Sequence, residues 1–533
     1  MVFGRYCIRK GNVLVRLPYL LYLQLSVCWI CLPVAADWPQ ASGPHGDFVV
    51  RGKAVTDFSV ALGKNIRWVA PLPSTGQGGV IVVGDRVFVT SHEPVTADTE
   101  LGSDIVGLCF DATTGNELWR RTIPGVRETD LSSLFSDNTA ASPVANQKHV
   151  VFVNVGGSVQ GFSHDGDLQW SQRWTPFGRH HARQHEPFLL NDSVVISRVN
   201  LDDLPLEVTT KSGAKKLGRG VQYWNRLQKR DLATGDLQWI SAAGTSVHST
   251  SMSGRFADGT SGILTGRGGG HQPPEEPFGL SMLKGSDGSV LWERSVKGYA
   301  AHQNAVWNSK FAVAFVQDQH LTLDTQTGET INQVSLSDNI TLTKQVDGHY
   351  ETQHGAKLKG VRKPLTYQTN VLVGDYHYFR THHDYLLGRV HVPSGKVEYL
   401  QVPVQVKRAS GENDLISWDN AMQNDMKNAN GHRVTQDRRN AGDGWGHVSA
   451  ASPIVVGEYL YMPTMLGMVY VVRWQAPRLD ENALVAVADL GPLGETWTLS
   501  SLSYSAGNLY ARTLKHLICI GIDPQDKVGL SSE

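Results

Sequence analysis

Residues 111–119 read DATTGNELW, and variants of this stretch recur along the chain. In each clear variant a polar turn reaches a glycine, and a tryptophan follows four residues later. The clear copies are DATTGNELW with Gly115 and Trp119, HDGDLQW with Gly166 and Trp170, DLATGDLQW with Gly235 and Trp239, and GSDGSVLW with Gly288 and Trp292. Weaker copies around Gly328 and Gly395 have Asn332 and Tyr399 in the tryptophan position. Self-similarity of this kind indicates a repeat architecture.

The residue types of the motif predict a tight β-hairpin followed by a packing contact. Asp and Thr side chains hydrogen-bond the backbone of a turn, and glycine adopts the left-handed conformation that closes a three-residue hairpin with a bulge. The tryptophan then begins the next strand. There its flat face can pack against the neighbouring repeat and bury roughly 150–250 Å².

Short paired strands surround each turn, and most alternate apolar and polar residues, which is the pattern of antiparallel hairpins. The segments VIVVGDRVFVTS and PIVVGEYLYMPT, beginning at Val80 and Pro453, are examples. We count eight units, at about residues 77–121, 139–174, 185–242, 248–297, 302–337, 368–403, 449–491 and 501–522. The sequence therefore predicts an all-β fold, an eight-bladed β-propeller of four-stranded antiparallel blades.

The eighth unit lacks an outer strand, because it stops shortly after HLICIG, which ends at Gly521. The segment IRWVAPLP, residues 66–73, precedes the first unit and has Trp68 where a last strand would have its tryptophan. Pairing of this segment with the C-terminal strand would close the ring and remove its open sheet edges. We therefore predict a propeller domain at residues 64–522, closed by an N-terminal strand.

The remaining segments are assigned by composition. Basic residues followed by an apolar stretch and Val34-Ala35-Ala36 predict a cleaved export signal at residues 1–36, with an uncleaved membrane anchor as the alternative. After signal cleavage we expect no membrane span, and we expect a periplasmic or secreted monomer. Residues 37–63 form an N-terminal extension, residues 523–533 a C-terminal tail, and about 199–221, 266–279 and 404–448 are loop insertions, the last a candidate lid.

Charge and cysteine content exclude some classes of function. A formal net charge of -1 provides no field that would attract the chain to nucleic acid, so we expect no nucleic-acid partner. Only Cys109 and Cys519 lie outside the predicted signal, which is too few for a disulfide framework. They are either small buried residues on strands or one bridge between the first and last blades, which ring closure would make neighbours.

The repeated hairpins resemble those of a known family. The hairpins LCFDATTGNELW, ending at Trp119, and RDLATGDLQW, ending at Trp239, are similar to the repeat of pyrroloquinoline-quinone (PQQ)-type propellers, in the quinoprotein alcohol dehydrogenase-like superfamily. The resemblance extends from about Asp37 to Gly521. The same repeat occurs in quinone-dependent dehydrogenases and in an outer-membrane assembly scaffold without a cofactor, so it implies a fold but no single activity.

The resemblance also implies what a quinone-dependent member would need. Such enzymes stack the quinone between a tryptophan and a disulfide of adjacent cysteines, and they hold calcium with carboxylate and amide oxygens. The chain has no adjacent cysteines, and no acidic cluster with calcium-ligand spacing stands out. We therefore expect no bound PQQ.

Histidines near the starts of several units are the remaining chemical signal. His248 and His302 lie three residues before the position that proline usually fills, and His185 and His447 lie within a few residues of it. In a closed ring the starts of the inner strands converge at one mouth of the channel, so these imidazoles are candidate ligands of zinc, copper, iron or nickel. Alternatively, each histidine satisfies backbone groups of its loop through its ring nitrogens.

Two hypotheses about function follow. In the first, the chain is an exported binding or scaffold module for a protein, peptide or glycan. In the second, it is an enzyme with a metal site at the mouth formed by His185, His248, His302 and His447. Quinone-dependent oxidation is a weaker third, because the cysteine pair is missing.

Overall fold

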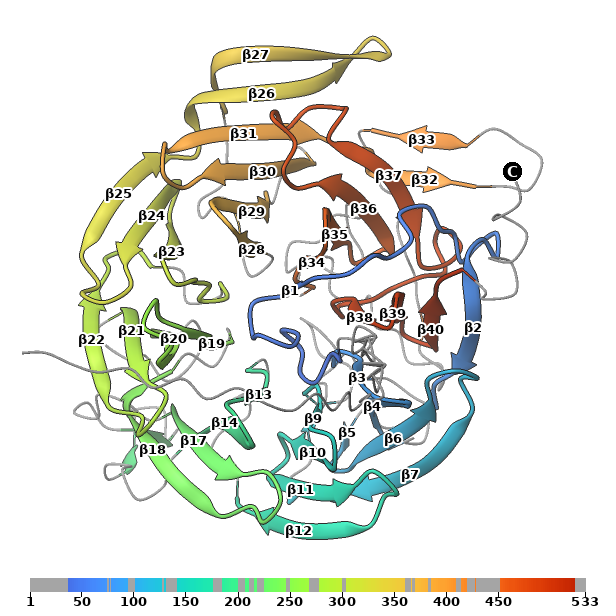
Figure 1. The fold of residues 1–533 in the computed structure, drawn as a ribbon, viewed down its shortest axis with the longest axis vertical. Helices are drawn as coiled ribbons and strands as arrows, with labels where there is room; N and C mark the ends of the chain where they lie inside the picture. The colour runs from blue at the N-terminus through green and yellow to red at the C-terminus, as the bar shows by residue number, and fades with distance from the viewer. Residues whose placement is uncertain are drawn as a thin grey trace, which may run out of the picture. The chain divides into compact units, whose positions relative to one another are not determined.

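Eight small antiparallel sheets surround a common axis in the computed structural model, and each forms one blade of a β-propeller (Figure 1). The eight-bladed all-β prediction is confirmed. The structure describes residues 37–73, 76, 78–93, 101–126, 129–130, 141–175, 185–199, 207–209, 215–217, 225–245, 250–267, 278–299, 303–359, 366, 370–381, 385–408, 414–418, 427 and 451–522. In these residues no helix has the length and apolar character needed to cross a membrane.

The first four blades follow the chain from the inner to the outer strand, with four strands each. Blade 1 contains β3 (Ile81–Val83), β4 (Arg86–His92), β6 (Ile105–Asp111) and β7 (Glu117–Ile123); blade 2 contains β9 (Val144–Ala145), β10 (His149–Asn154), β11 (Ser158–Ser163) and β12 (Leu168–Arg173). Blade 3 contains β13 (Phe188–Leu189), β14 (Ser193–Val199), β17 (Asn225–Asp231) and β18 (Leu237–Gly244); blade 4 contains β19 (Met252–Arg255), β20 (Ser261–Arg267), β21 (Gly279–Lys284) and β22 (Val290–Ser295).

The other four blades vary this plan. Blade 5 contains β23 (Phe311–Val316), β24 (Gln319–Asp324) and β25 (Thr330–Ser335); blade 6 contains β28 (Asn370–Val373), β29 (Tyr376–Arg380), β30 (Leu386–His391) and β31 (Lys396–Gln401). Blade 7 contains β34 (Ile454–Val456), β35 (Tyr459–Pro463), β36 (Met468–Arg473) and β37 (Leu484–Asp489); blade 8 contains β38 (Ser503–Ser505), β39 (Asn508–Arg512), β40 (His516–Ile520) and β2 (Ile66–Pro71). Blade 5 has no regular inner strand, and a single bridge between Trp307 and Ala312 takes its place.

Short hairpins and strands are added to this ring. The hairpin of β26 (Asp338–Val346) and β27 (His349–Lys357) extends blade 6, because β26 pairs in parallel with β31. The sequence pattern did not indicate this hairpin, which lies between the fifth and sixth predicted units. The smaller pairs are β5 (Leu101–Gly102) with β8 (Thr129–Asp130), β15 (Glu207–Thr209) with β16 (Lys215–Leu217), and β32 (Gln405–Lys407) with β33 (Leu415–Ser417).

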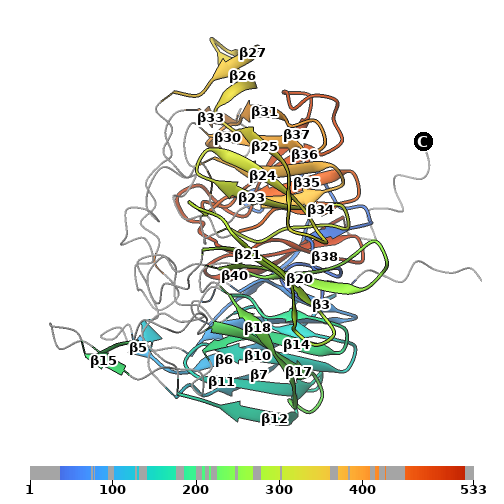
Figure 2. The same ribbon diagram turned by 90° about the vertical axis from the view of Figure 1, so that its left-hand side faces the viewer.

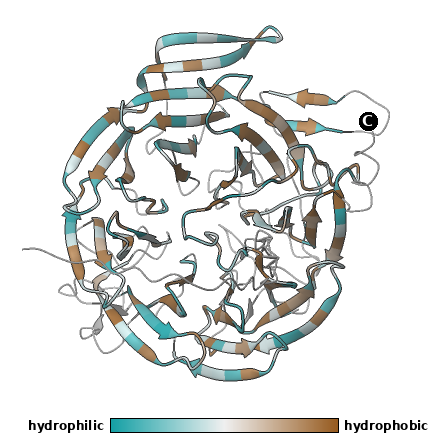
Figure 3. Ribbon diagram, in the orientation of Figure 1, coloured by the Kyte–Doolittle hydropathy of each residue, from teal (hydrophilic) through white to brown (hydrophobic). Residues whose placement is uncertain are grey.

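Burial differs between the inner and outer strands of a blade. Strand β4 is buried at six of its seven positions because neighbouring blades cover both of its faces, whereas β7 alternates between buried and exposed side chains. The hydropathy colouring shows the same change, from apolar inner strands to mixed outer strands (Figure 3). The core of the molecule is therefore the set of seams between blades.

The ring is closed by the N-terminal strand, as predicted. Strand β2 pairs antiparallel with β40, so Val69 lies opposite Ile518 and Ala70 lies opposite Leu517. Blade 8 is thus built from both ends of the propeller. This closure leaves no open edge between the first and last blades.

The repeated tryptophans lie in the seams, each over the turn glycine of the next blade. A Cβ atom added to the glycine would lie within 3.0 Å of the indole in all five seams from blade 8 around to blade 5: Gly115 on Trp68 (2.7 Å), Gly166 on Trp119 (3.0 Å), Gly235 on Trp170 (2.5 Å), Gly288 on Trp239 (2.8 Å) and Gly328 on Trp292 (2.6 Å). These glycines also have positive φ angles of 71–86°. Only glycine meets both requirements, since it has no Cβ and adopts this conformation without strain.

Hydrogen bonds fix the indoles to these turns. The Nε1–H groups donate to turn carbonyl oxygens of the next blade: Trp68 to Ala112 (3.0 Å), Trp119 to His164 (2.8 Å), Trp170 to Leu232 (3.0 Å) and Trp292 to Thr325 (2.8 Å). In the first turn, the Asp111 carboxylate accepts hydrogen bonds from the backbone N–H groups of Thr113 and Thr114. The turn therefore presents both a flat surface and an acceptor to the indole.

Cys109 and Cys519 are buried free thiols. Burial raises the pKa of each thiol to about 12. The alternative of a bridge between blades 1 and 8 is not realised. The indole of Trp68, which pairs in register with Cys519, fills this seam by lying on Gly115 of blade 1.

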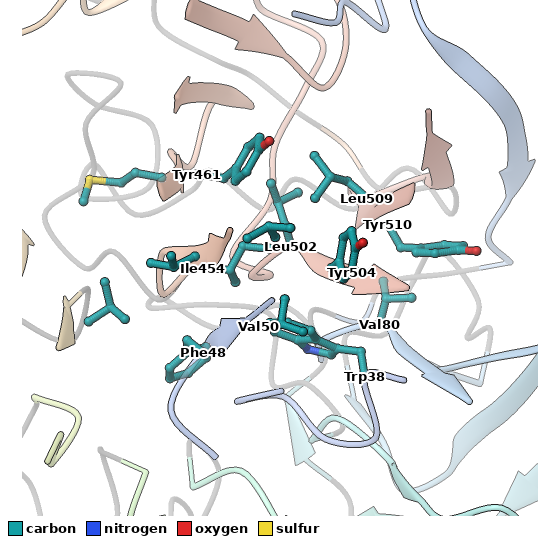
Figure 4. Close-up of a cluster of buried hydrophobic side chains, with 14 of the residues drawn as sticks. Trp38, Phe48, Val50, Val80, Ile454, Tyr461, Leu502, Tyr504, Leu509 and Tyr510 are labelled. Carbon is teal, nitrogen blue, oxygen red and sulfur yellow. The ribbon is translucent and has the colours of Figure 1, made fainter. Parts of the chain in front are cut away.

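The N-terminal segment runs along the inner strands before it reaches β2. Trp38 makes two backbone hydrogen bonds with Val82 of blade 1, and the Gln40 side chain accepts a hydrogen bond from the Leu189 N–H of blade 3 (2.6 Å). Strand β1 (Val49–Val50) then pairs in parallel with β34 of blade 7. Figure 4 shows side chains of this segment among those of blades 7 and 8. The segment therefore links blades that are distant in sequence.

The contact between indole and glycine makes a prediction about stability. We expect Gly235→Ala to destabilise the protein more than Gly259→Ala, although both glycines have positive φ angles, 77° and 85°. A methyl group at Gly235 would meet Trp170, whereas nothing lies within 4 Å of one at Gly259. The shared backbone strain costs about 1–2 kcal/mol, and the overpacking adds about 1–3 kcal/mol. Urea unfolding followed by tryptophan fluorescence measures the difference; equal losses would contradict the account.

Candidate functional site

The two faces of the ring differ in the length of their connections. The strands of a blade alternate in direction. The inner strand therefore starts on the same face as the connection between the second and third strands of its blade. We call the opposite face the turn face. Its turns vary in length, from the short turn at residues 84–85 to the longer one at residues 474–483. The first face, called the loop face, carries longer connections such as 200–224 and 402–453. Strands β5 and β15 both lie on this side of the ring (Figure 2).

A belt of hydrogen bonds joins the starts of the inner strands on the loop face. Backbone N–H groups donate to side-chain oxygens of the next blade: Gly79 to Ser142 Oγ (2.5 Å), Ser142 to Glu186 Oε2 (2.7 Å), Glu186 to Thr250 Oγ1 (3.2 Å), Thr250 to Asn304 Oδ1 (3.4 Å) and Ser452 to Ser501 Oγ (2.8 Å). The Asn304 Nδ2 group donates to Ser452 Oγ (2.8 Å), which connects blade 5 to blade 7. We call Gly79, Ser142, Glu186, Thr250, Asn304, Ser452 and Ser501 the polar belt.

The sequence analysis did not identify the polar belt, although its residues share a position in the repeat. Ser142, Glu186 and Ser452 each come directly before a proline, and Thr250 and Asn304 occupy the same place before other residues. Serine and threonine before proline are common in loops, so their chemistry alone does not distinguish them. Their shared position in the repeat, shortly before the inner strand begins, was the available signal.

Glu186 is the carboxylate of the polar belt. Burial raises its pKa above the ordinary value, and the hydrogen bond from Ser142 offsets part of this effect. The charged carboxylate therefore sits in an environment that disfavours charge. A group of this kind can accept hydrogen bonds or bind a cation.

His185, next to Glu186, is buried and neutral. Its Nε2 atom accepts a hydrogen bond from the Ser251 N–H (3.3 Å) and lies 3.0 Å from Ser251 Oγ, so the ring proton of the neutral form is on Nδ1. The Ser251 hydroxyl also contacts those of Thr245 and Thr265, at 3.1 and 2.8 Å. Burial lowers the pKa of His185 to about 4. The imidazole thus bonds to the start of blade 4 through its Nε2 atom.

The metal site proposed from the other histidines cannot be placed. His248, His302 and His447 lie outside the described residues. Within the described ranges, no group of three His, Cys, Asp or Glu side chains is positioned to hold a metal ion.

The described residues do not fit the quinone and calcium that the fold family implies. The two described cysteines are separate free thiols on β6 and β40, so no adjacent disulfide can stack on a quinone. In the polar belt the described carboxylate is that of Glu186, and it accepts the Ser142 N–H. We derive no chemical step through either group.

Comparisons with known proteins agree with the repeat and the fold. The sequence family described as outer membrane protein assembly factor BamB matches residues 51–199. No curated protein sequence matches the chain.

Solved structures resemble the chain at low sequence identity. A quinohemoprotein alcohol dehydrogenase from Pseudomonas putida is 10% identical with a TM-score of 0.51, over 92% of this chain and 81% of that one. A europium-containing methanol dehydrogenase is 10% identical with a TM-score of 0.49, over 89% of each chain. BamB from Moraxella catarrhalis is 11% identical with a TM-score of 0.34, over 72% of this chain and 94% of that one. The repeat and the ring of blades together show an eight-bladed β-propeller that is similar over residues 51–199 to the BamB sequence family and similar in fold to a quinohemoprotein alcohol dehydrogenase.

Proposed function

We propose that the chain is an exported binding or scaffold propeller that holds a protein or peptide partner on its loop face. The observation that carries this proposal is the difference between the two faces. Turns on the turn face are limited by the tryptophan contacts, whereas the loop face bears the long connections around the polar belt. Long loops on a rigid scaffold are where binding residues concentrate.

The polar belt supports binding more than catalysis. Its backbone N–H groups and side-chain oxygens satisfy one another around the mouth, and His185 is bonded to Ser251, which is 2% exposed. Burial of this serine supports a structural role for the pair. The sequence family matched by residues 51–199 is described as an assembly factor, which is consistent with a protein partner.

Glu186 adds a second argument, because its charge costs stability. A glutamine would make the same bond to Ser142 without burying a charge. Groups that lower stability are commonly kept for function. We therefore assign Glu186 to the partner-binding surface, as an acceptor for a cationic or N–H group.

We expect Glu186→Gln to raise the melting temperature at pH 7 and Glu186→Ala to lower stability by about 1–3 kcal/mol, since alanine leaves the Ser142 N–H without its acceptor. The pKa of Glu186 is raised in the fold from an ordinary value near 4.5. Below that pH the carboxyl carries a proton in both folded and unfolded states, so the advantage of glutamine should vanish there. Thermal melts from pH 4 to pH 8 provide the measurement. A glutamine variant that melts lower than wild type at pH 7 would remove this argument.

A photo-crosslinking amino acid placed on each face tests the proposed function. Lys297 and Lys515 are exposed on the loop face, and the matched controls Lys148 and Lys284 are exposed on the turn face. In cells that express the protein naturally, we expect a protein adduct from Lys297 or Lys515 and none from the two controls. Adducts from the controls alone, or from none of the four positions, would count against a partner on the loop face.

A further inference from the structure

The seam between blades 5 and 6 is built differently from the five seams that hold tryptophans. Strand β25 has Asn332 in the tryptophan position, and a Cβ on Gly395 of blade 6 would meet Val334 Cγ1 at 2.6 Å. A valine side chain buries less apolar surface than an indole. This seam therefore depends more on its other contacts.

Two buried imidazoles supply one of these contacts. His320 of blade 5 and His377 of blade 6 are each 1% exposed, and their Nε2 and Nδ1 atoms lie 2.9 Å apart. His377 Nε2 lies 3.2 Å from Asn370 Oδ1, and the ring stacks on Phe315 at 4.8 Å between centroids. The pair therefore bridges the seam from β24 to β29.

The hydrogen-bond partners determine the protonation of the pair. The Asn370 oxygen only accepts, so His377 Nε2 carries a proton and His377 Nδ1 accepts from His320 Nε2–H. His320 Nδ1 is left as an acceptor, 3.5 Å from the Thr322 hydroxyl. Both rings are thus neutral. A proton added to His377 Nδ1 would place two N–H donors against each other.

Among the described residues, no carboxylate raises the pKa of either imidazole of the pair. The two strands that carry the histidines have charged residues at their ends. Asp318 precedes β24, Asp324 ends β24 and Arg380 ends β29. None of these three shifts the pKa of either imidazole. Tyr378 of β29 donates instead to the Trp474 carbonyl of blade 7. Burial alone lowers the pKa of His320 to about 3, and burial together with His320 lowers the pKa of His377 well below 6.5.

We propose that the seam between blades 5 and 6 is an acid-sensitive opening point of the ring, held by the His320–His377 hydrogen bond. In the open seam both imidazoles can bind protons at their ordinary pKa near 6.5, while the closed seam excludes them. The seam is therefore fully stable above that pH and loses stability as the pH falls toward 3. The β26–β27 hairpin would stay with blade 6 on opening, because β26 pairs with β31 of that blade.

Hydrogen exchange of the full-length protein tests the proposal. Between pH 7.5 and 4.5, after correction for the intrinsic exchange rate, we expect loss of protection in β24, β25 and β29 and steady protection in blades 1 and 2. Two protons per opening give up to about a hundredfold change in the opening constant per pH unit once the pH is well below 6.5. Protection lost evenly around the ring, or first in another seam, would overturn the proposal.

A double variant isolates the imidazoles. In His320→Gln with His377→Gln the amides can continue the hydrogen-bond chain but do not titrate in this range, so the pH dependence of the seam should disappear. The matched control His185→Gln removes a buried imidazole between blades 3 and 4 and should leave that dependence intact. An unchanged pH dependence in the double variant would also overturn the proposal. If the double variant does not fold, the wild-type exchange map still decides between opening at this seam and opening elsewhere.

Discussion

An indole lying on a glycine without a side chain is the contact on which the ring depends. The turn must be left-handed at the glycine, must bear no Cβ and must offer a carbonyl oxygen to the indole N–H, as Gly115 and Ala112 do for Trp68. Each contact therefore orients the next blade relative to the last. Five seams repeat it, and the strand that carries Trp68 links the final blade to the first.

This constraint also explains why the two faces differ. Turns that hold an indole have little freedom in length or sequence, whereas connections on the loop face are free to lengthen. The polar belt gives that face a rigid centre, because it joins the starts of the inner strands of blades 1 to 5 and of blades 7 and 8 by hydrogen bonds. A fixed ring with variable loops is suited to presenting a surface to a partner.

The sequence predicted features that depend on local patterns, such as the turn glycines and the pairing of the Trp68 strand with β40. It did not predict contacts between residues that are far apart and chemically ordinary. Gln40 bound to Leu189 and His320 bound to His377 belong to this class, because nothing in the sequence near either partner indicates the other. The belt serines share a position in the repeat, but serine before proline is too common in loops to indicate their bonds. The disulfide alternative failed for a similar reason: ring closure makes Cys109 and Cys519 neighbours in blade order, but an indole fills their seam.

Ring closure is tested most directly by native-state hydrogen exchange at residues 66–71 and 516–520, which form β2 and β40. If β2 completes blade 8, the amides of the two strands that bond to each other should be protected and should lose protection together as denaturant is added. If 66–71 exchange as a free chain while 516–520 stay protected, the ring is not fastened by this strand, and the account of its closure is wrong.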